Sequence, residues 1–460
     1  MKKLLLILLC LPMIGFGQNV YIPDANFKAY LVGNAAINTN GDAEIQVSEA
    51  AIFGGGINCS NWGIFDLTGI DAFTNLDSLL CDSNSLIYLD ITSNGMLRVL
   101  SCSHNALTSL DVSSNLALSN LYCQNNQLTS LDVSANLALT HLNCGNIVGG
   151  NLLTSLDVSA NLSLTDLRCF SNQLTSLDVS SNLALTTLFC YDNPLTSLDV
   201  SANLALSTLY CLESQLTSLD VSSNLALTYL WCQNNQLTSL DVSANLALTH
   251  LFCFSNQLTS LDLSSNLALI RLRCNSNQLT SLDLRNGNNT NLPINSYLNL
   301  TNNPQLFCID VDDPVYSTAN WLNIDAWASF SSNCATALGC TDPNACNYDA
   351  LATIDDSSCI YGISSSSYDT LLVAANIVWN GDTLNVSGDY SDTLINSAGC
   401  DSIAYLNLTI TNTTGILDLT SKKQIVKIID MLGQKTPYKR NTPLFYIYDD
   451  GTVEKRIVIE

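Results

Sequence analysis

Between residues 76 and 282 the apolar and polar positions of the chain follow one repeating pattern. Residues 227–247, LTYLWCQNNQLTSLDVSANLA, split into two halves of the form L-x-x-L-x-[C/V]-x-x-N. In each half apolar positions alternate, as in Leu230 with Cys232 and Leu240 with Val242, which is the period of a strand with one buried face. The asparagine that follows begins a turn. The pattern therefore predicts two short strands in each coil and two parallel sheets packed back to back.

Cysteines mark the period of this pattern. They recur every 21 residues, with one gap of 25, at Cys81, Cys102, Cys123, Cys144, Cys169, Cys190, Cys211, Cys232, Cys253 and Cys274. A constant period in this range predicts a solenoid, in which each coil buries its apolar side against its neighbours. The extra residues in GNIVGGN, 145–151, are expected to form a loop at one coil edge. A long stack of similar coils suits binding better than catalysis.

The motif L-x-x-L-x-C-x-x-N-x-L followed by x-x-L-D-V-S-x-N resembles a bacterial leucine-rich repeat of the short, 21-residue kind. It is most similar to the repeats of cysteine-ladder, internalin-like surface proteins. The resemblance covers residues 59–311, with a variant first coil around Cys59 and an irregular last coil in YLNLTNNPQL. It implies a mainly β leucine-rich-repeat solenoid and a binding role, without naming a ligand.

Two columns of identical side chains follow from in-register stacking. Parallel strands about 4.8 Å apart place neighbouring Cβ atoms beyond the ~3.5–4.5 Å of a disulfide, so the ladder cysteines are expected to be free, buried thiols; a metal-binding thiolate column is the alternative. An aspartate column either accepts hydrogen bonds at its turns or is lined by divalent cations. It consists of Asp90, Asp111, Asp132, Asp157, Asp178, Asp199, Asp220, Asp241, Asp262 and Asp283.

The chain's start and charge point to an extracellular location. Residues 1–17, MKKLLLILLCLPMIGFG, have two lysines before an apolar run and small residues near Gln18, which is typical of a cleaved signal peptide. No later stretch is long and apolar enough to span a bilayer. The net charge of −24 disfavours nucleic acid and anionic membranes as partners. We therefore expect a secreted protein on the outer cell surface.

Apart from Cys10 in the signal-like segment and Cys59 in the first coil, six cysteines lie outside the ladder, and they fit an oxidising compartment. Cys308 and Cys334 flank a capping segment, residues 312–338, and are expected to form a disulfide that closes the solenoid. Cys340, Cys346, Cys359 and Cys400 permit three pairings, between which the sequence does not choose.

Residues 18–58 are expected to form a helical N-terminal cap, with Asp24 near the start of its first helix and a second helix from Ser48. The loop between them resembles a calcium-binding EF-hand loop, although Ala43 stands where glycine is needed for the sharp turn. A hydrogen-bonded polar turn is the alternative. Its candidate calcium ligands are Asn38, Asn40, Asp42, Glu44 and Glu49. No other cofactor is indicated.

Three modules are expected after the cap. Residues 339–362 are rich in cysteine and aspartate and resemble a motif of secreted bacterial proteins, whose oxygens either bind calcium or cap disulfide-stapled turns. Residues 363–413 alternate in polarity, which predicts a small antiparallel β module. Residues 414–460 contain IIDMLGQ and YIYDDGTVEKRIVIE and resemble a type IX secretion C-terminal sorting domain. That resemblance implies the type IX machinery as a partner; a terminal β-hairpin is the alternative.

The outward face of the cysteine strands varies from coil to coil and supplies the candidate binding site. Aromatic and arginine side chains gather there, whereas the other solenoid faces are expected to carry Ser, Thr and Asn. Exposed aromatic patches mark interaction sites, although neighbouring aromatics on a sheet also stabilise one another. The candidate ligand-binding residues are Tyr122, Arg168, Phe170, Phe189, Tyr191, Tyr210, Tyr229, Trp231, His250, Phe252, Phe254, Arg271 and Arg273.

Catalytic motifs are not found in the sequence, and His141 and His250 lie five coils apart, so we expect no enzyme. The sequence predicts a secreted, surface-displayed adhesin that recognises a protein or a polysaccharide through this face. The alternatives are the targeting part of an extracellular hydrolase and a calcium-stiffened structural surface protein.

Overall fold

The computed structural model describes residues 18–146, 150–292, 297–361, 366–373, 376–395, 401–410, 424–430, 434–437, 443–448 and 452–456. Its contacts divide the chain into two compact units, Met1–Cys359 and Ile360–Glu460. The predicted signal peptide, the tip of the predicted GNIVGGN loop and Cys400 lie outside the described residues.

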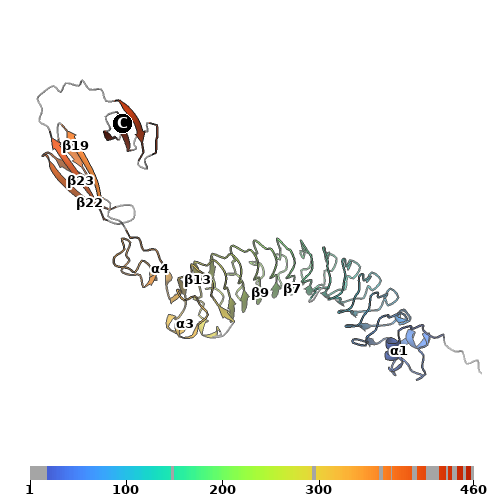
Figure 1. Ribbon diagram of the computed structural model, residues 1–460. Coiled ribbons are helices and arrows are strands. Elements are labelled where there is room, and N and C mark those ends of the chain that lie inside the picture. Colours follow the sequence, from blue (N-terminus) through green and yellow to red (C-terminus); the bar gives the residue numbers. More distant parts are fainter. Residues whose placement is uncertain are drawn as a thin grey trace, which may run out of the picture. The chain divides into compact units, whose positions relative to one another are not determined.

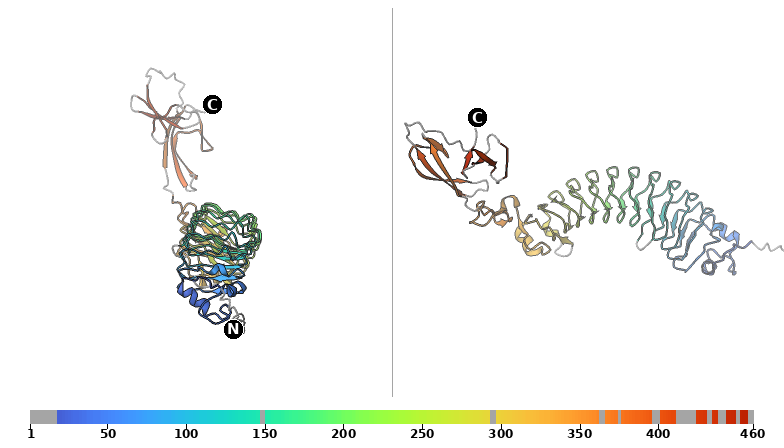
Figure 2. Two further views of the ribbon diagram at one scale, coloured as in Figure 1. Left: turned by 90° about the vertical axis from the view of Figure 1, so that its right-hand side faces the viewer. Right: turned by 45° about the horizontal axis from the view of Figure 1, so that its top comes forward.

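In the first unit the cysteine half of each coil contributes one short strand to a parallel sheet (Figure 1). Its strands are β1 (Gly56–Asn58), β2 (Ser78–Leu80), β3 (Val99–Ser101), β4 (Asn120–Tyr122), β5 (His141–Asn143), β6 (Asp166–Arg168), β7 (Thr187–Phe189), β8 (Thr208–Tyr210), β9 (Tyr229–Trp231), β10 (His250–Phe252), β12 (Arg271–Arg273) and β14 (Leu298–Asn299). Successive strands pair one period apart, as Leu209 with Leu230 and Leu230 with Leu251. The predicted in-register stacking is thereby confirmed, and one view of Figure 2 looks along the stack of coils.

The second predicted sheet is shorter than expected. It consists of β11 (Ser260–Asp262), β13 (Ser281–Asp283), β15 (Cys308–Asp310) and β16 (Ser329–Ser331). In the earlier described coils the Leu-Asp-Val positions form no strand, and a turn follows them, as at Ser243 and Ala244, so the prediction of a strand in each of these coils is wrong. The stack is curved, with β7 and β9 on the inner side of the arc (Figure 1), which separates the outer halves of successive coils. The Asp199 carboxylate accepts a hydrogen bond from the Ser201 N–H at 2.9 Å. The strand residues Asp262 and Asp283 accept the same bond, so this contact does not decide where the outer strands form.

The core is a continuous stack of leucines and thiols. All ten ladder cysteines and Cys59 are free and buried, as predicted. Burial raises the pKa of the Cys232 and Cys274 thiols to about 12, because an apolar interior disfavours the thiolate. The thiols therefore remain neutral at physiological pH and pack as small apolar groups.

Two short caps close the solenoid. At the N-terminal end are α1 (Ala25–Val32), α2 (Val47–Ile52) and the 3-10 turn η1 (Ile70–Ala72). Asp24 caps α1 by accepting hydrogen bonds from the Asn26 and Phe27 N–H groups at 2.9 Å, and it also accepts one from Phe65 N–H at 2.8 Å. The same carboxylate thus starts the helix, as predicted, and ties it to the first coil.

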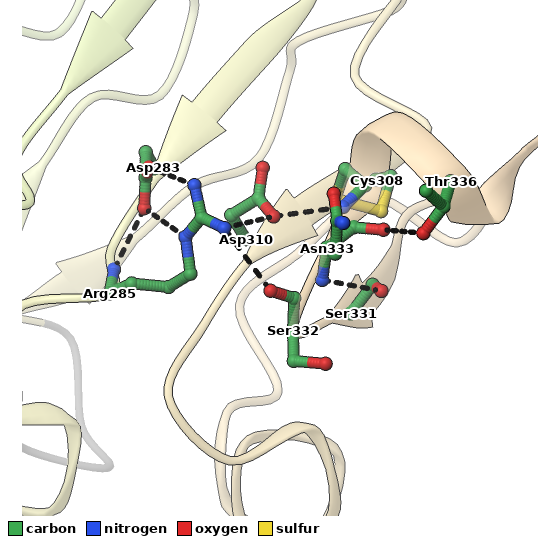
Figure 3. The surroundings of a disulfide bond; sticks show 9 residues. Asp283, Arg285, Cys308, Asp310, Ser331, Ser332, Asn333 and Thr336 are labelled. Atoms are coloured by element: carbon green, nitrogen blue, oxygen red, sulfur yellow. Dashed lines mark hydrogen bonds and ion pairs between the residues drawn. A yellow bond between two sulfur atoms is a disulfide. The ribbon is translucent and has the colours of Figure 1, made fainter.

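The C-terminal cap contains η2 (Asn289–Asn291), α3 (Pro314–Asn320) and α4 (Cys334–Ala337). The expected disulfide joins Cys308 and Cys334. Beside it the Arg285 guanidinium contacts the Asp283 carboxylate, lies 3.6 Å from Asp310 and donates to the Ser332 carbonyl at 3.2 Å (Figure 3). Arginine and disulfide together connect the last coils to the cap.

The segment after this cap holds β17 (Leu338–Gly339) and β18 (Ile354–Asp355), which pair in parallel. A second disulfide joins Cys340 and Cys359, and Cys346 is also disulfide-bonded. The Cys340–Cys359 bond selects one of the pairings that the sequence left open.

The described residues of the second unit form three small sheets. The first joins β19 (Ser366–Val373), β23 (Asp401–Ile410) and β22 (Gly388–Ile395); the second is a hairpin of β20 (Ile377–Trp379) and β21 (Asp382–Leu384); the third joins β24 (Ile425–Ile429), β25 (Leu444–Tyr448) and β26 (Val453–Arg456). The predicted antiparallel module is partly wrong, since β19 pairs with β23 in parallel. A parallel pair needs a crossover, and here β20, β21 and β22 occupy the connection.

Across the described residues no helix has both the length and the apolar character of a membrane span. In the same part of the chain, no three His, Cys, Asp or Glu side chains gather as a metal site would require.

Candidate binding face

In strands such as β6, β7 and β8 the middle leucine is buried, and the first and third side chains are half-buried on the outward face of the large sheet. The third residues form what we call the ring column, and the first residues form the second column. The ring column runs Tyr122, Asn143, Arg168, Phe189, Tyr210, Trp231, Phe252, Arg273, and the second column runs Asn120, His141, Asp166, Thr187, Thr208, Tyr229, His250, Arg271.

Four consecutive aromatic rings of the ring column stack on one another. The ring centroids of Phe189 and Tyr210 are 4.3 Å apart, those of Tyr210 and Trp231 4.2 Å, and those of Trp231 and Phe252 5.1 Å. Adjacent planes deviate by 6°, 7° and 20°. The predicted mutual stabilisation of neighbouring aromatics is therefore present from Phe189 to Phe252.

An arginine covers each end of this stack. The Arg168 guanidinium carbon lies 4.8 Å from the Phe189 ring centre, and that of Arg273 lies 5.6 Å from the Phe252 ring centre. Guanidinium groups at these distances are attracted by the negative face of a ring. The faces of all four rings are thus covered from within the protein, and the ring edges are what the column presents outward.

The second column has its own shorter stack. The rings of Tyr229 and His250 lie 4.4 Å apart, and Arg271 lies 4.0 Å from the centre of the Tyr297 ring. Burial, together with the Arg271 charge, lowers the pKa of His250. His250 is therefore a neutral, stacked side chain at physiological pH.

Three predicted contact residues are more buried than the sequence indicated. Phe170, His250 and Phe252 have only 7%, 8% and 7% of their surface exposed. Phe170 stacks on Tyr191 at 4.7 Å, and a Cβ atom at Gly145 would come within 2.7 Å of the Phe170 ring. The glycine one coil earlier thus lets this ring fold onto the sheet. Tyr191 and Phe254 are half-buried beside the columns, and Tyr229 is the most exposed of the predicted rings.

A hollow interrupts the ring column at Asn143. It has a volume of about 380 Å³ and is lined by Tyr122, His141, Leu142, Asn143, Asp166 and Arg168. The sequence prediction included Tyr122 and Arg168 but missed the other four residues. The signal that could have found them is the single short side chain between Tyr122 and Arg168 in an otherwise bulky column.

The candidate calcium loop forms a hydrogen-bonded turn. Glu49 Oε1 accepts hydrogen bonds from the Thr39 N–H and hydroxyl and from Asn40 N–H at 2.8–3.1 Å, and Oε2 accepts one from Gln46 N–H at 3.1 Å. Burial raises the pKa of Glu49, but these bonds outweigh it and the net shift is downward. Asn38, Asn40 and Asp42 bond one another and nearby backbone, and Glu44 pairs with Lys28 at 2.6 Å. The contacts are those of the turn alternative, and calcium would have to replace them.

The outer side of the solenoid carries two further columns. Each aspartate accepts a hydrogen bond from the N–H two residues later, and in the Asp199 coil the side chain and backbone of Ser201 lower the pKa of the carboxyl. The capping interpretation of the aspartate column is thereby confirmed. An exposed leucine column was missed, so the expectation of purely polar outer faces is wrong. It comprises Leu116, Leu137, Leu162, Leu183, Leu204, Leu225, Leu246 and Leu267, each 62–65% exposed.

Comparisons with known proteins identify the fold. No protein-family model matches the chain, and no curated protein does. Among solved structures, the functional domain of InlJ from Listeria monocytogenes, which includes a cysteine ladder, is similar with 28% identity and a TM-score of 0.57, covering 96% of this chain and 98% of that one. The internalin InlF from the same organism has 19% identity and a TM-score of 0.51, covering 68% of this chain and 98% of its own. The chain therefore has the leucine-rich-repeat fold, built as a cysteine-ladder solenoid similar to that of InlJ.

Proposed function

We propose that this protein is a bacterial surface binding protein that recognises a protein partner through the two outward columns of its large sheet. The observation that carries the proposal is the continuous stack of rings between Arg168 and Arg273. Tyrosine, tryptophan and arginine are the residues that dominate protein interfaces. Held between neighbours, these side chains lose little further freedom on binding, which lowers the entropic cost of association.

The orientation of the rings favours a protein over a polysaccharide. A sugar packs against an aromatic side chain by lying on the ring face, and the faces of Phe189, Tyr210, Trp231 and Phe252 are covered by one another and by the arginines. The accessible edges, together with Thr187 and Thr208 in the second column, give a ridged surface of mixed polarity. Such a surface suits side-chain contacts at a protein interface.

The location belongs to the same proposal. The similarity to internalin-type structures, the signal-like residues 1–17 and the sorting-like residues 414–460 support display on the outer surface through type IX secretion. The leucine-rich-repeat fold, with its extended sheet face, supports a binding role.

A charge placed on the sheet tests this function. The full chain is applied to an array of extracellular proteins and glycans, as the unaltered protein and as Thr208→Glu. Thr208 is half-buried on the outward face, one coil before Tyr229 in the second column and on the same strand as Tyr210. A carboxylate there is expected to weaken binding to a protein on the array by about tenfold or more.

Thr217→Glu is the matched control, because it makes the same change in the same coil at an exposed position away from the large sheet. It is expected to leave binding unchanged. Equal binding by both variants, or binding confined to glycans, would contradict the proposed function.

A further inference from the structure

The ring column has one coil without a ring. Strands β4, β5 and β6 pair in register, so Tyr122, Asn143 and Arg168 follow one another in the column. Asn143 is short, and the 380 Å³ hollow opens above it. This volume falls within the ~300–1,000 Å³ that is usual for binding pockets.

The size of the gap matches one planar group. Neighbouring parallel strands lie about 4.8 Å apart, so Tyr122 and Arg168 are separated by about two such spacings. Rings in the existing stack lie 4.2–5.1 Å from one another. A ring inserted over Asn143 would therefore lie at an ordinary stacking distance from both neighbours.

The Arg168 side of the gap is already organised. Asp166 accepts two hydrogen bonds from the Arg168 guanidinium, both at 2.9 Å, which fixes the plane of the group. Phe189, in the following coil, covers one face of that plane. The other face is turned to the preceding coil and borders the hollow, where it can contact an aromatic ring by a cation–π interaction.

The opposite wall and the rim complete the recognition surface. Tyr122 faces the hollow across Asn143, and the residue before Tyr122 in the column is the small Ser101. His141, Asn143 and Asp166 supply donors and acceptors at the rim. These groups suit a ring that carries its own polar atom, as tyrosine and tryptophan do.

We propose that this hollow receives a tyrosine or tryptophan side chain of the protein partner, which completes the ring column between Tyr122 and Arg168. The inference rests on the proposed function and names the anchor by which a partner would be held. A buried aromatic anchor in a preformed pocket is the usual form of a binding hot spot.

The test uses N-acetyl-L-tyrosinamide as the probe and N-acetyl-cyclohexylalaninamide as a probe of similar shape without a π system. Binding to the full chain is measured by ligand-observed NMR. The tyrosine probe is expected to bind with a Kd on the order of 1 mM, and the saturated-ring probe roughly tenfold more weakly.

Asn143→Phe fills the gap and is expected to weaken binding of the tyrosine probe by roughly tenfold or more. Asn143→Ala is the matched control. Like Asn143→Phe, it loses the hydrogen bond that Asn143 Oδ1 accepts from the Gly145 N–H, but it keeps the gap, so probe binding is expected to persist. Thr217→Phe adds a ring on an exposed position elsewhere and is expected to have no effect. Tyr122→Leu removes one aromatic wall of the hollow and is expected to weaken binding of the tyrosine probe. This variant keeps the test decisive if Asn143→Phe does not fold.

Equal binding of the two probes, or undiminished binding by folded Asn143→Phe or by Tyr122→Leu, would overturn the inference. The proposed function is judged separately. If a partner from the array no longer binds Thr208→Glu but still binds Asn143→Phe, the proposed binding face is supported and the proposed aromatic anchor is contradicted.

Discussion

Asparagine side chains hold each coil to the preceding one through the backbone. Asn235 Nδ2 donates to the Cys211 and Cys232 carbonyls at 2.9 and 3.1 Å, and its Oδ1 accepts from Leu216 N–H at 3.0 Å. A second buried asparagine in each coil, such as Asn224, donates to two carbonyls of the preceding coil. The sequence marked these asparagines as turn residues but did not show that their amides bridge coils, because that role depends on atoms 19 to 24 positions away.

One coil lacks the first of these bridges. Ser214 stands where the neighbouring coils have asparagine, and Leu195 N–H bonds instead to the Asn193 carbonyl at 2.8 Å. Ser214→Asn is expected to raise the free energy of unfolding by about 1 kcal/mol, since it restores hydrogen bonds to buried backbone groups. Urea unfolding measures the change. Asn235→Ser, the reverse change in the next coil, is expected to lower the free energy of unfolding by about 1–3 kcal/mol. A change of the same sign and size in both variants would contradict the bridging role.

Because its thiols are buried, the cysteine ladder is expected to make the free energy of unfolding fall as the pH rises into the alkaline range. An unfolded thiol has a pKa near 8.5, whereas burial raises that of Cys232 to about 12. Between these values the unfolded chain binds fewer protons than the folded one, so stability falls as pH rises. Between pH ~8 and ~10, each thiol is expected to lower the free energy of unfolding by ~2 kcal/mol. The urea concentration at the unfolding midpoint should therefore fall steeply over that interval. Cys232→Ala should reduce the slope; a midpoint independent of pH would show that the thiols titrate normally.

At the scale of elements, the strands of the large sheet were predicted correctly, whereas the outer strands were predicted in every coil but form only from β11 onward. The alternation around Leu230 and Cys232 specifies a strand because it fixes one buried face. The same alternation around Leu240 and Val242 forms no strand, because the period describes burial and not hydrogen-bond partners. The ring column was recognised as a patch, but its internal stacking follows from the plane of each ring, which a sequence pattern does not contain.

The stack predicts that its members also support the fold. Trp231 contacts a ring on each side, and each stacked pair contributes about 0.5–1.5 kcal/mol beyond its buried area. Trp231→Ala is therefore expected to lower the free energy of unfolding by about 3 kcal/mol or more, in the range found for buried aromatic truncations. Leu204→Ala, at a position 63% exposed, should change it by less than about 0.5 kcal/mol. If both variants lower the free energy of unfolding by a similarly small amount, stacking along the ring column does not stabilise the fold.

The N-terminal cap gives a prediction that separates its two interpretations. Glu49 accepts four hydrogen bonds within the loop, so Glu49→Ala is expected to lower stability by about 1–3 kcal/mol. Because hydrogen bonding lowers the Glu49 pKa, its contribution is present above the unfolded value near 4.3 and is lost as pH falls through the folded one. Calcium chloride is expected to leave the Tm unchanged. A calcium-dependent rise that Glu49→Ala abolishes would establish the EF-hand-like interpretation.

At the scale of the whole molecule, a fixed period was enough to predict a solenoid with an internal ladder and a large sheet whose outward face varies from coil to coil. It was not enough to predict the hollow at Asn143, which depends on one short side chain among bulky neighbours, or the exposed leucine column on the outer side. Both arise from differences between positions that the period treats as equivalent. The parts of the face that carry specificity are therefore those that depart from the repeat.

Hydroxyl-radical footprinting of the full chain, with and without a partner found on the array, tests the binding face most directly. The radicals label accessible aromatic side chains. The partner is expected to protect Tyr210, Tyr229 and Trp231, while Trp62 and Tyr88, outside the two stacks, react as before. Protection of Trp62 or Tyr88 with unchanged labelling of Tyr210, Tyr229 and Trp231 would show that the partner binds elsewhere.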